Sequence, residues 1–160
     1  MIEQKDINTI KETIKEFFAK MTMPILDTKA DLSGDSAKEN KEVVNLEIKV
    51  EEPQILIGQG GQTLFEIQRL LKTILNKKLQ KIFFLNLDIN DYKKKKIEYL
   101  KDLAKDLADQ VSLSKEEKAL SPMLAYERRV IHAELSLRSD ITTESRGEGV
   151  DRYIVIKPKQ

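Results

Sequence analysis

The sequence predicts an α+β protein made of two small domains, and three observations support this prediction. Stripes of apolar residues at helical spacing alternate along the chain with short segments in which apolar and polar residues alternate. The length of 160 residues is enough for two small domains. An α-β-β-α-α-β order closes near residue 90, and a second α+β set follows without a flexible linker. We therefore expect domains at residues 1–90 and 91–160.

The composition favours a soluble, cytoplasmic binding protein. Charged residues make up 34% of the chain, no apolar run approaches the roughly 20 residues of a membrane span, and the N-terminus has no signal-like segment. Cysteine is absent, and the single histidine leaves little from which to build a zinc site. We therefore expect no membrane span, no metal, no cofactor and no catalytic residues.

The first expected domain begins with a helix over residues 4–20, where apolar residues recur at helical spacing. Residues 21–31 are expected to form a strand, and Pro24 favours a place for it at the edge of a sheet. Alternation from residue 44 to residue 50 predicts a second strand. A turn at residues 33–36 would join the two strands into a hairpin.

Two further helices are expected before the last strand of this domain. Pro53 predicts a short helical turn over residues 53–57. Thr63 and Glu66 have the spacing of a capping box, which predicts a longer helix from about residue 63. Its apolar stripe consists of Leu64, Ile67, Leu71, Ile74 and Leu75. A strand over 83–89 would complete a three-stranded sheet with helices on one face.

The second expected domain begins with a long helix that Asn90 and Asp91 would cap and that continues to Val111. A helix N-terminus disfavours cations by about 0.3–1 kcal/mol each. The first turn nevertheless contains Lys93, Lys94, Lys95 and Lys96. A local rule broken without a structural gain indicates a functional segment.

The remainder of this domain is expected to be helical first and then β. The spacing of Ser114 and Glu117 predicts a short helical turn before residue 121. Ser121-Pro122 predicts a helix over residues 122–137. Residues that favour strands predict the last two elements, at 141–143 and 153–156, with a turn at 147–149.

Positive charge is concentrated in the middle of the chain. The net charge is +1, but residues 58–96 contain nine lysines and arginines against three acidic residues. A local basic block is the electrostatic signature of a nucleic-acid site. A solvated lysine surface without a ligand is the alternative.

The basic block begins at the glycine stretch Gly58-Gln59-Gly60-Gly61, between two expected helices. Glycines let the backbone approach a ligand closely, and the following helix N-terminus would favour a phosphate. A Walker loop requires Lys after the glycines, where Gln62-Thr63 stands here, and a dinucleotide fingerprint requires glycine at position 63. The remaining match is the GXXG arrangement, with which a KH domain clamps about four nucleotides by their backbone. A plain helix–helix connection is the alternative.

A second candidate site lies on the helix expected over residues 122–137. Arg128 and His132 are four residues apart and therefore share a helix face. Arginine can bind a phosphate through two hydrogen bonds, and imidazole can bind a phosphate or stack on a base. Arg129 would add a further cation. A packed structural histidine is the alternative for His132.

Together these motifs resemble the Jag family, the bacterial SpoIIIJ-associated proteins. The family pairs a KH domain of the prokaryotic type with a domain named for its Arg-x-x-x-His signature, which binds single-stranded nucleic acid. The resemblance covers roughly residues 1–158. It rests on IGQGGQTL with Ile67-Gln68, Ser121-Pro122-Met123, Glu127-Arg128-Arg129-x-Ile131-His132, Thr143-Glu144-Ser145, Gly147-Glu148 and Arg152.

Two departures from the family accompany this resemblance. The family loop usually carries a basic residue in its middle, where this chain has Gln59-Gly60. Many members also have an extra N-terminal domain, and we expect a short form without it because the chain starts at the KH-like helix.

The resemblance implies a non-catalytic, single-stranded RNA-binding protein of the bacterial cytoplasm, acting as a post-transcriptional regulator or RNA chaperone. The expected binding residues are Gly58, Gln59, Gly60, Gly61, Gln62, Lys93, Lys94, Lys95, Lys96, Arg128, Arg129 and His132. Three alternatives stay open. They are a single-stranded DNA binder, an adaptor whose KH half has lost RNA binding and docks another KH-domain protein, and an enzyme acting on nucleotides.

Overall fold

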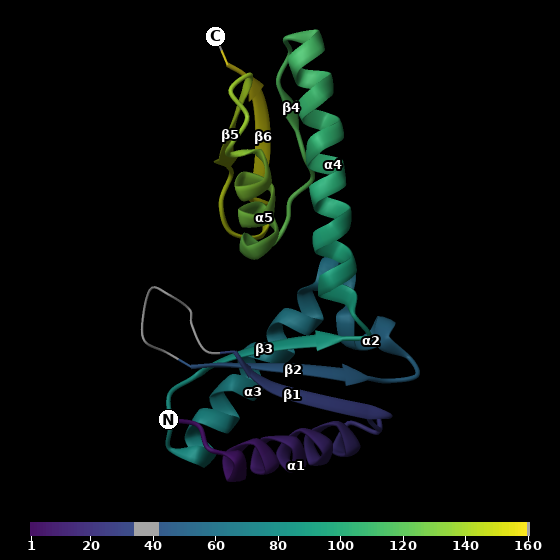
Figure 1. Cartoon of the computed structure of the whole chain (residues 1–160). Coiled ribbons are helices and arrows are strands. Elements are labelled where there is room, and N and C mark those ends of the chain that lie inside the picture. The colour runs from purple at the N-terminus through teal and green to yellow at the C-terminus, as the bar shows by residue number, and fades with distance from the viewer. Residues whose placement is uncertain (34–41, 160) are drawn as a thin grey trace. The chain divides into compact units, whose positions relative to one another are not determined.

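The computed structural model describes residues 1–33 and 42–159, and the chain divides into two compact units, Met1–Tyr92 and Lys93–Gln160. Each unit has its own three-stranded sheet, its own helices and its own apolar core (Figure 1). The predicted α+β class is therefore confirmed. That residues 1–90 and 91–160 are separate domains stays a prediction.

The first unit has the predicted α-β-β-α-α-β order, with one additional 3₁₀ turn in the glycine stretch. Its elements are α1 (Gln4–Lys20), β1 (Asp27–Ser33), β2 (Val43–Lys49), α2 (Pro53–Ile57), η1 (Gln59–Gly61), α3 (Gln62–Leu79) and β3 (Phe84–Ile89). Strand β1 is antiparallel to β2, and β2 is parallel to β3, which makes β1 and β3 the two edges. Figure 1 shows α1 and α3 on the same side of this sheet.

The core of the first unit lies between these two helices and the sheet. Fully buried side chains come from every layer: Ile10, Ile14, Phe18, Leu46, Ile48, Leu64, Leu71, Leu75 and Leu87. The predicted stripe of α3 is buried except at Ile74, which is only partly buried. Lys78 Nζ of α3 donates to Thr13 Oγ1 of α1 at 2.9 Å, so a polar contact accompanies the packing of the two helices.

Two boundaries in the first unit differ from the prediction. Residues 21–26 form no strand, because the chain reverses after α1 and the amides of Met21 and Met23 donate to carbonyls of its last turn. Helix α3 starts at Gln62 rather than 63, and the predicted capping box of Thr63 and Glu66 is absent. The turn predicted at 33–36 falls mostly on residues outside the described part of the chain.

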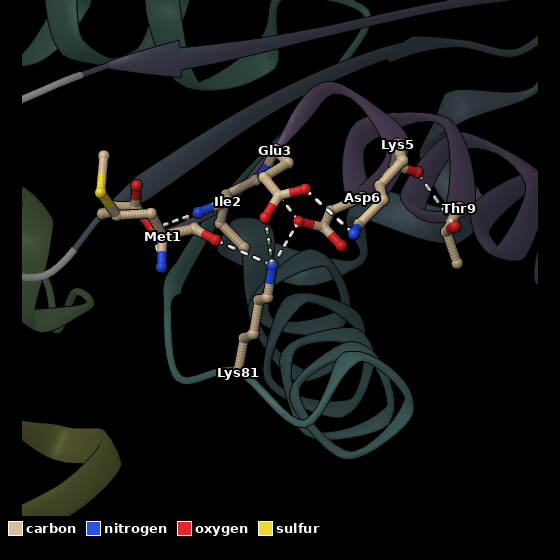
Figure 2. Close-up of polar contacts among 8 residues, drawn as sticks. Met1, Ile2, Glu3, Lys5, Asp6, Thr9 and Lys81 are labelled. Carbon is tan, nitrogen blue, oxygen red and sulfur yellow. Dashed lines mark hydrogen bonds and ion pairs between the residues drawn. The ribbon is translucent and has the colours of Figure 1, made fainter.

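Lys81 fastens the start of α1 to the segment between α3 and β3 (Figure 2). Its Nζ donates to Asp6 Oδ2 at 2.7 Å and to the carbonyl of Met1 at 2.8 Å. Asp6 also accepts the backbone N–H of Glu3 at 2.7 Å, which completes a capping box at the N-terminus of α1. The hydrogen bond from Lys81 is the main reason that the pKa of Asp6 lies below its ordinary value.

Side chains occupy backbone donors along the edge strand β3. Gln68 of α3 accepts the backbone N–H of Leu87 through Oε1 at 3.0 Å. Asp88 accepts the N–H of Ile89 through Oδ1 at 2.8 Å. These donors are therefore engaged within the unit.

The second unit contains α4 (Tyr92–Ser114), which begins at the last residue of the first unit. Its other elements are β4 (Lys118–Ala119), α5 (Ala125–Leu135), β5 (Ile141–Arg146), η2 (Gly149–Asp151) and β6 (Tyr153–Pro158). The sheet order is β4-β6-β5, and both pairings are antiparallel. Its core joins α4 and α5 to the sheet through Leu100, Ala104, Ala108, Val111, Ile131, Leu135, Ile154 and Ile156.

Three predictions for the helices of this region are wrong. Asn90 does not cap α4, because its side-chain amide makes two hydrogen bonds with the backbone of Val50, at 2.9 and 3.0 Å. The helical turn predicted before residue 121 is replaced by strand β4. Helix α5 covers Ala125–Leu135 instead of 122–137. The amides of Leu120 and Met123 donate to carbonyls at Ile154 and Arg152, which keeps the preceding segment extended.

Candidate nucleic-acid interface

The three glycines at the start of the basic block all have positive φ, at 71° for Gly58, 58° for Gly60 and 80° for Gly61. A Cβ on Gly58 would lie 2.0 Å from Thr63 Oγ1, and one on Gly61 would lie 3.0 Å from the Tyr92 ring. A Cβ on Gly60 would meet nothing within 4 Å. Gly58 and Gly61 are therefore required by packing as well as by φ, whereas Gly60 is required by φ alone.

The exposed part of this loop is its middle, Gln59-Gly60. Because Gly61 is the N-cap residue of α3, no side chain caps the first turn of that helix. Uncapped N–H groups and the positive end of the helix dipole favour an anion there. Gln62 Nε2 donates weakly to Glu66 Oε1, at 3.4 Å, so this predicted binding residue already has an acidic neighbour. The loop therefore offers backbone donors but no cation of its own.

The four predicted lysines form the first turn of α4, as expected. Lys94 and Lys95 are exposed, whereas Lys93 and Lys96 are half-buried. Lys96 Nζ lies 3.8 Å from Glu127 Oε1 and 5.8 Å from the centroid of the Tyr99 ring. Lys96 therefore has a structural task in the second unit, and Lys95 is better placed to meet solvent ions.

Glu127 explains why α5 begins where it does. Its side chain is buried, with 2% of the residue exposed. Oε2 accepts the backbone N–H of Leu124 at 2.9 Å, which is the N-cap position of the helix. Oε1 accepts no hydrogen bond, and the ammonium group of Lys96 supplies its compensating charge. This carboxylate fixes the first turn of α5, from which Arg128 projects.

Arg128 is joined to the segment before its own helix. Its Nη1 donates to the carbonyl of Met123 at 2.7 Å. The amide of Met123 in turn donates to the carbonyl of Arg152 at 3.1 Å, so this segment lies beside the start of β6. A guanidinium has several N–H donors, and one bond to a carbonyl leaves others for a ligand. Arg129, the next residue, is exposed.

His132 lies one turn after Arg128 and reaches strand β5 with both ring nitrogens. Nδ1 is 2.6 Å from Thr143 Oγ1, and Nε2 is 3.2 Å from Ser145 Oγ. Burial, and secondarily the charge of Arg128, lower the pKa of His132, so the ring is neutral at pH 7. The imidazole is thus half-buried and held by hydroxyls, which combines the structural role with a place on a polar surface.

Thr143 and Ser145 were not among the residues predicted to bind. They are two residues apart on β5 and therefore face the same side of the strand. That alternation was the available signal in the sequence. Without knowledge that β5 lies beside α5, nothing connected these hydroxyls with His132.

Most cations of the second unit are engaged by acidic partners. Arg138 pairs with Asp109 and Asp140, and Arg146 pairs with Glu117 and Glu144. Lys101 and Lys105 approach Glu134, and Lys157 pairs with Glu144. Among the described residues of this unit, the arginines that form no ion pair are Arg128, Arg129 and Arg152. These are the guanidinium groups with charge available for a ligand.

Other kinds of site were sought in the same part of the chain. Within residues 1–33 and 42–159, no group of His, Asp and Glu side chains is arranged to hold a metal ion. The helices of these segments also lack the combination of length and apolar character needed to cross a membrane.

Comparison with known proteins gives a consistent result. The family model of the domain named for its Arg-x-x-x-His signature matches residues 98–158. RNA-binding protein KhpB of Clostridium symbiosum is 32% identical over the whole of this chain, which covers 71% of that relative. RNA-binding protein KhpB of Bacillus subtilis strain 168 is 36% identical over 85% of this chain and 66% of the relative. The protein of that name from Streptococcus pneumoniae D39 is 31% identical over 82% of this chain, but over only 39% of its own length.

The fold and the site define an α+β protein in which a unit of KH-type order, with a GXXG loop, precedes an Arg-x-x-x-His unit. The chain belongs to the Jag family, together with these relatives. The resemblance found in the motifs is therefore confirmed.

Proposed function

We propose that this chain is a non-catalytic protein that binds single-stranded RNA. The names of its relatives and the match to the Arg-x-x-x-His domain support this function. The observation that carries it is the polar surface of α5 and β5. There Arg128 and Arg129 form no ion pair and stand beside His132, in a unit whose other arginines except Arg152 are paired.

Each part of the chain would have a defined task. Arg128 and Arg129 would bind phosphates, because a guanidinium matches the geometry of phosphate oxygens. The backbone N–H groups of Gln59 and Gly60 would approach a second stretch of the strand. Lys95 would add contacts that do not depend on sequence. A bacterial, cytoplasmic role in post-transcriptional regulation or as an RNA chaperone would follow from such binding.

Titration of an unstructured, fluorescently labelled RNA at several salt concentrations tests this function. We expect Arg128→Gln/Arg129→Gln to weaken binding at least about tenfold, since hydrogen bonds to charged groups contribute roughly 1.5–3 kcal/mol each. The dependence on salt should also become shallower, by about 0.7 in slope per lost phosphate contact. Lys159→Gln, which removes an exposed charge elsewhere in the second unit, should leave both quantities nearly unchanged.

Two results would contradict the proposal. One is equal binding by the arginine variant and the Lys159→Gln control. The other is an affinity of the unaltered chain no higher than that of an unrelated neutral protein. Release of phosphate from nucleoside triphosphates, abolished by His132→Ala, would contradict the non-catalytic part.

The adaptor function is favoured by one observation, the absence of a cation from the exposed Gln59-Gly60 segment. The variant Gln59→Asp/Gly60→Asp places two negative charges where a phosphate would lie. Gln59→Asn/Gly60→Asn is a matched control, because Asn and Asp both tolerate a left-handed backbone and the position of Gly60 is open. If the loop binds RNA, the Asp variant should bind several-fold more weakly than the Asn variant. Equal affinities, with another KH-domain protein still retained, would favour the adaptor.

A further inference from the structure

We propose that Thr143 and Ser145 form a subsite for the 2′-hydroxyl group of ribose, with His132 setting the direction of their hydrogen bonds. The subsite deepens the proposed function and rests on it, because it requires that the second unit bind a single strand. It would let the protein distinguish RNA from DNA through residues outside the Arg-x-x-x-His signature.

The first step is the hydrogen-bond pattern around the imidazole. A neutral imidazole has one N–H donor and one bare nitrogen that accepts. His132 contacts a hydroxyl with each nitrogen, so in either tautomer one hydroxyl donates to the ring and the other accepts from it. The distance of 2.6 Å to Thr143 is typical of a hydroxyl donor, and 3.2 Å to Ser145 suits an N–H donor. These lengths favour Thr143 as the donor to Nδ1.

The second step concerns what the two hydroxyls then offer to a ligand. Ser145, which accepts from the ring, keeps its own proton for an outside acceptor. Thr143 has used its proton and presents lone pairs only. Both residues are half-buried and retain contact with solvent. The pair therefore presents one donor beside one acceptor.

This pairing matches a ribose hydroxyl better than it matches a phosphate. A phosphate oxygen only accepts, so it could use Ser145 but would face the lone pairs of Thr143. A 2′-hydroxyl both donates and accepts, and it is the group that separates RNA from DNA. Arg128, one turn earlier on α5, supplies donors only and suits the neighbouring phosphate.

The charges around the ring keep this pattern in place. Arg128 disfavours a second proton on His132, and burial acts in the same direction on its pKa. Glu144 lies between the two hydroxyl residues in sequence and so on the opposite side of the strand. Its carboxylate is engaged by Arg146 and by Lys157 of β6. No acidic group is therefore directed at the imidazole from β5.

The test compares three strands of one sequence, made of RNA, DNA and 2′-fluoro RNA, bound to the full chain. The fluoro strand keeps an RNA-like sugar but cannot donate from the 2′ position. We expect the unaltered protein to prefer RNA over both others by about three- to tenfold, the effect of one or two hydrogen bonds. Thr143→Val/Ser145→Ala should lose this preference while its affinity for DNA stays within about twofold.

Two further variants make the test specific. Thr142→Val changes an exposed hydroxyl on the other side of β5, and it should keep the preference. Thr143→Ser retains the hydroxyl and should also keep it. A chain that binds all three strands equally, or a double variant that still prefers RNA, overturns the subsite. Failure of the unaltered chain to bind any strand overturns the proposed function itself.

Discussion

At the scale of single residues, Gly58 shows how one missing side chain sets the shape of the loop. Its φ is 71°, and a Cβ would lie 2.0 Å from Thr63 Oγ1. We expect Gly58→Ala to lower the free energy of unfolding by at least about 2 kcal/mol, from strain and overlap together. Gly60→Ala, with strain but no overlap, should lose only about 1–2 kcal/mol. Urea denaturation measures both, and equal losses would contradict the difference in packing.

His132 gives the molecule a pH dependence that can be isolated, because it is the only histidine. Its pKa in the folded state lies below the ordinary value of 6.5. As the pH falls below about 6.5, the unfolded chain takes up a proton that the folded chain resists, so the free energy of unfolding should fall. His132→Gln should flatten the change measured between about pH 7.5 and 5.5. An unchanged slope in that variant would assign the effect to other groups.

The sequence placed Arg128, Arg129 and His132 on one helix through spacing alone, and α5 contains all three. Spacing could not show that His132 would contact Thr143 and Ser145, because the contact joins two elements. Nor could it show that Lys96 stands 3.8 Å from a buried carboxylate. Partners distant in sequence decide whether a cation is available, and composition does not reveal them.

At the scale of elements, the start of α5 depends on Glu127 rather than on the predicted Ser121-Pro122. Glu127→Ala removes the acceptor for the amide of Leu124, and we expect a loss of about 1–2 kcal/mol in the free energy of unfolding. Glu98→Ala, the same change at an exposed position of α4, should have little effect. Thermal unfolding followed by circular dichroism compares them. Similar melting temperatures for both variants would remove Glu127 from this role.

Elements with strong periodicity were predicted well. The bounds of α1 and α2 are confirmed, and each strand from β2 onward except β4 overlaps a predicted one. The errors occur where tertiary hydrogen bonds override local signals. Residues before α5 have the composition of a helix start but are held extended by the carbonyls of Ile154 and Arg152. Asn90 has the composition of a cap, yet its amide serves Val50.

At the scale of the whole molecule, two candidate surfaces lie on two units of one chain. If both bind, a strand long enough to reach them should gain affinity because its second contact is intramolecular. We expect RNA of about 30 nucleotides to bind at least about tenfold more tightly than a strand of about four, the length that a KH domain clamps. In Gln59→Asp/Gly60→Asp this gain should shrink. Affinities that do not depend on length, measured by anisotropy, would leave a single working surface.

The edge strand β3 has a consequence for the behaviour of the protein at high concentration. A sheet edge with free backbone donors is a template on which strands of other molecules can assemble. Gln68 and Asp88 already occupy the amides of Leu87 and Ile89, so an incoming strand would have to displace them. These two side chains therefore act against self-association into fibres, and they do so without touching the surfaces assigned to RNA.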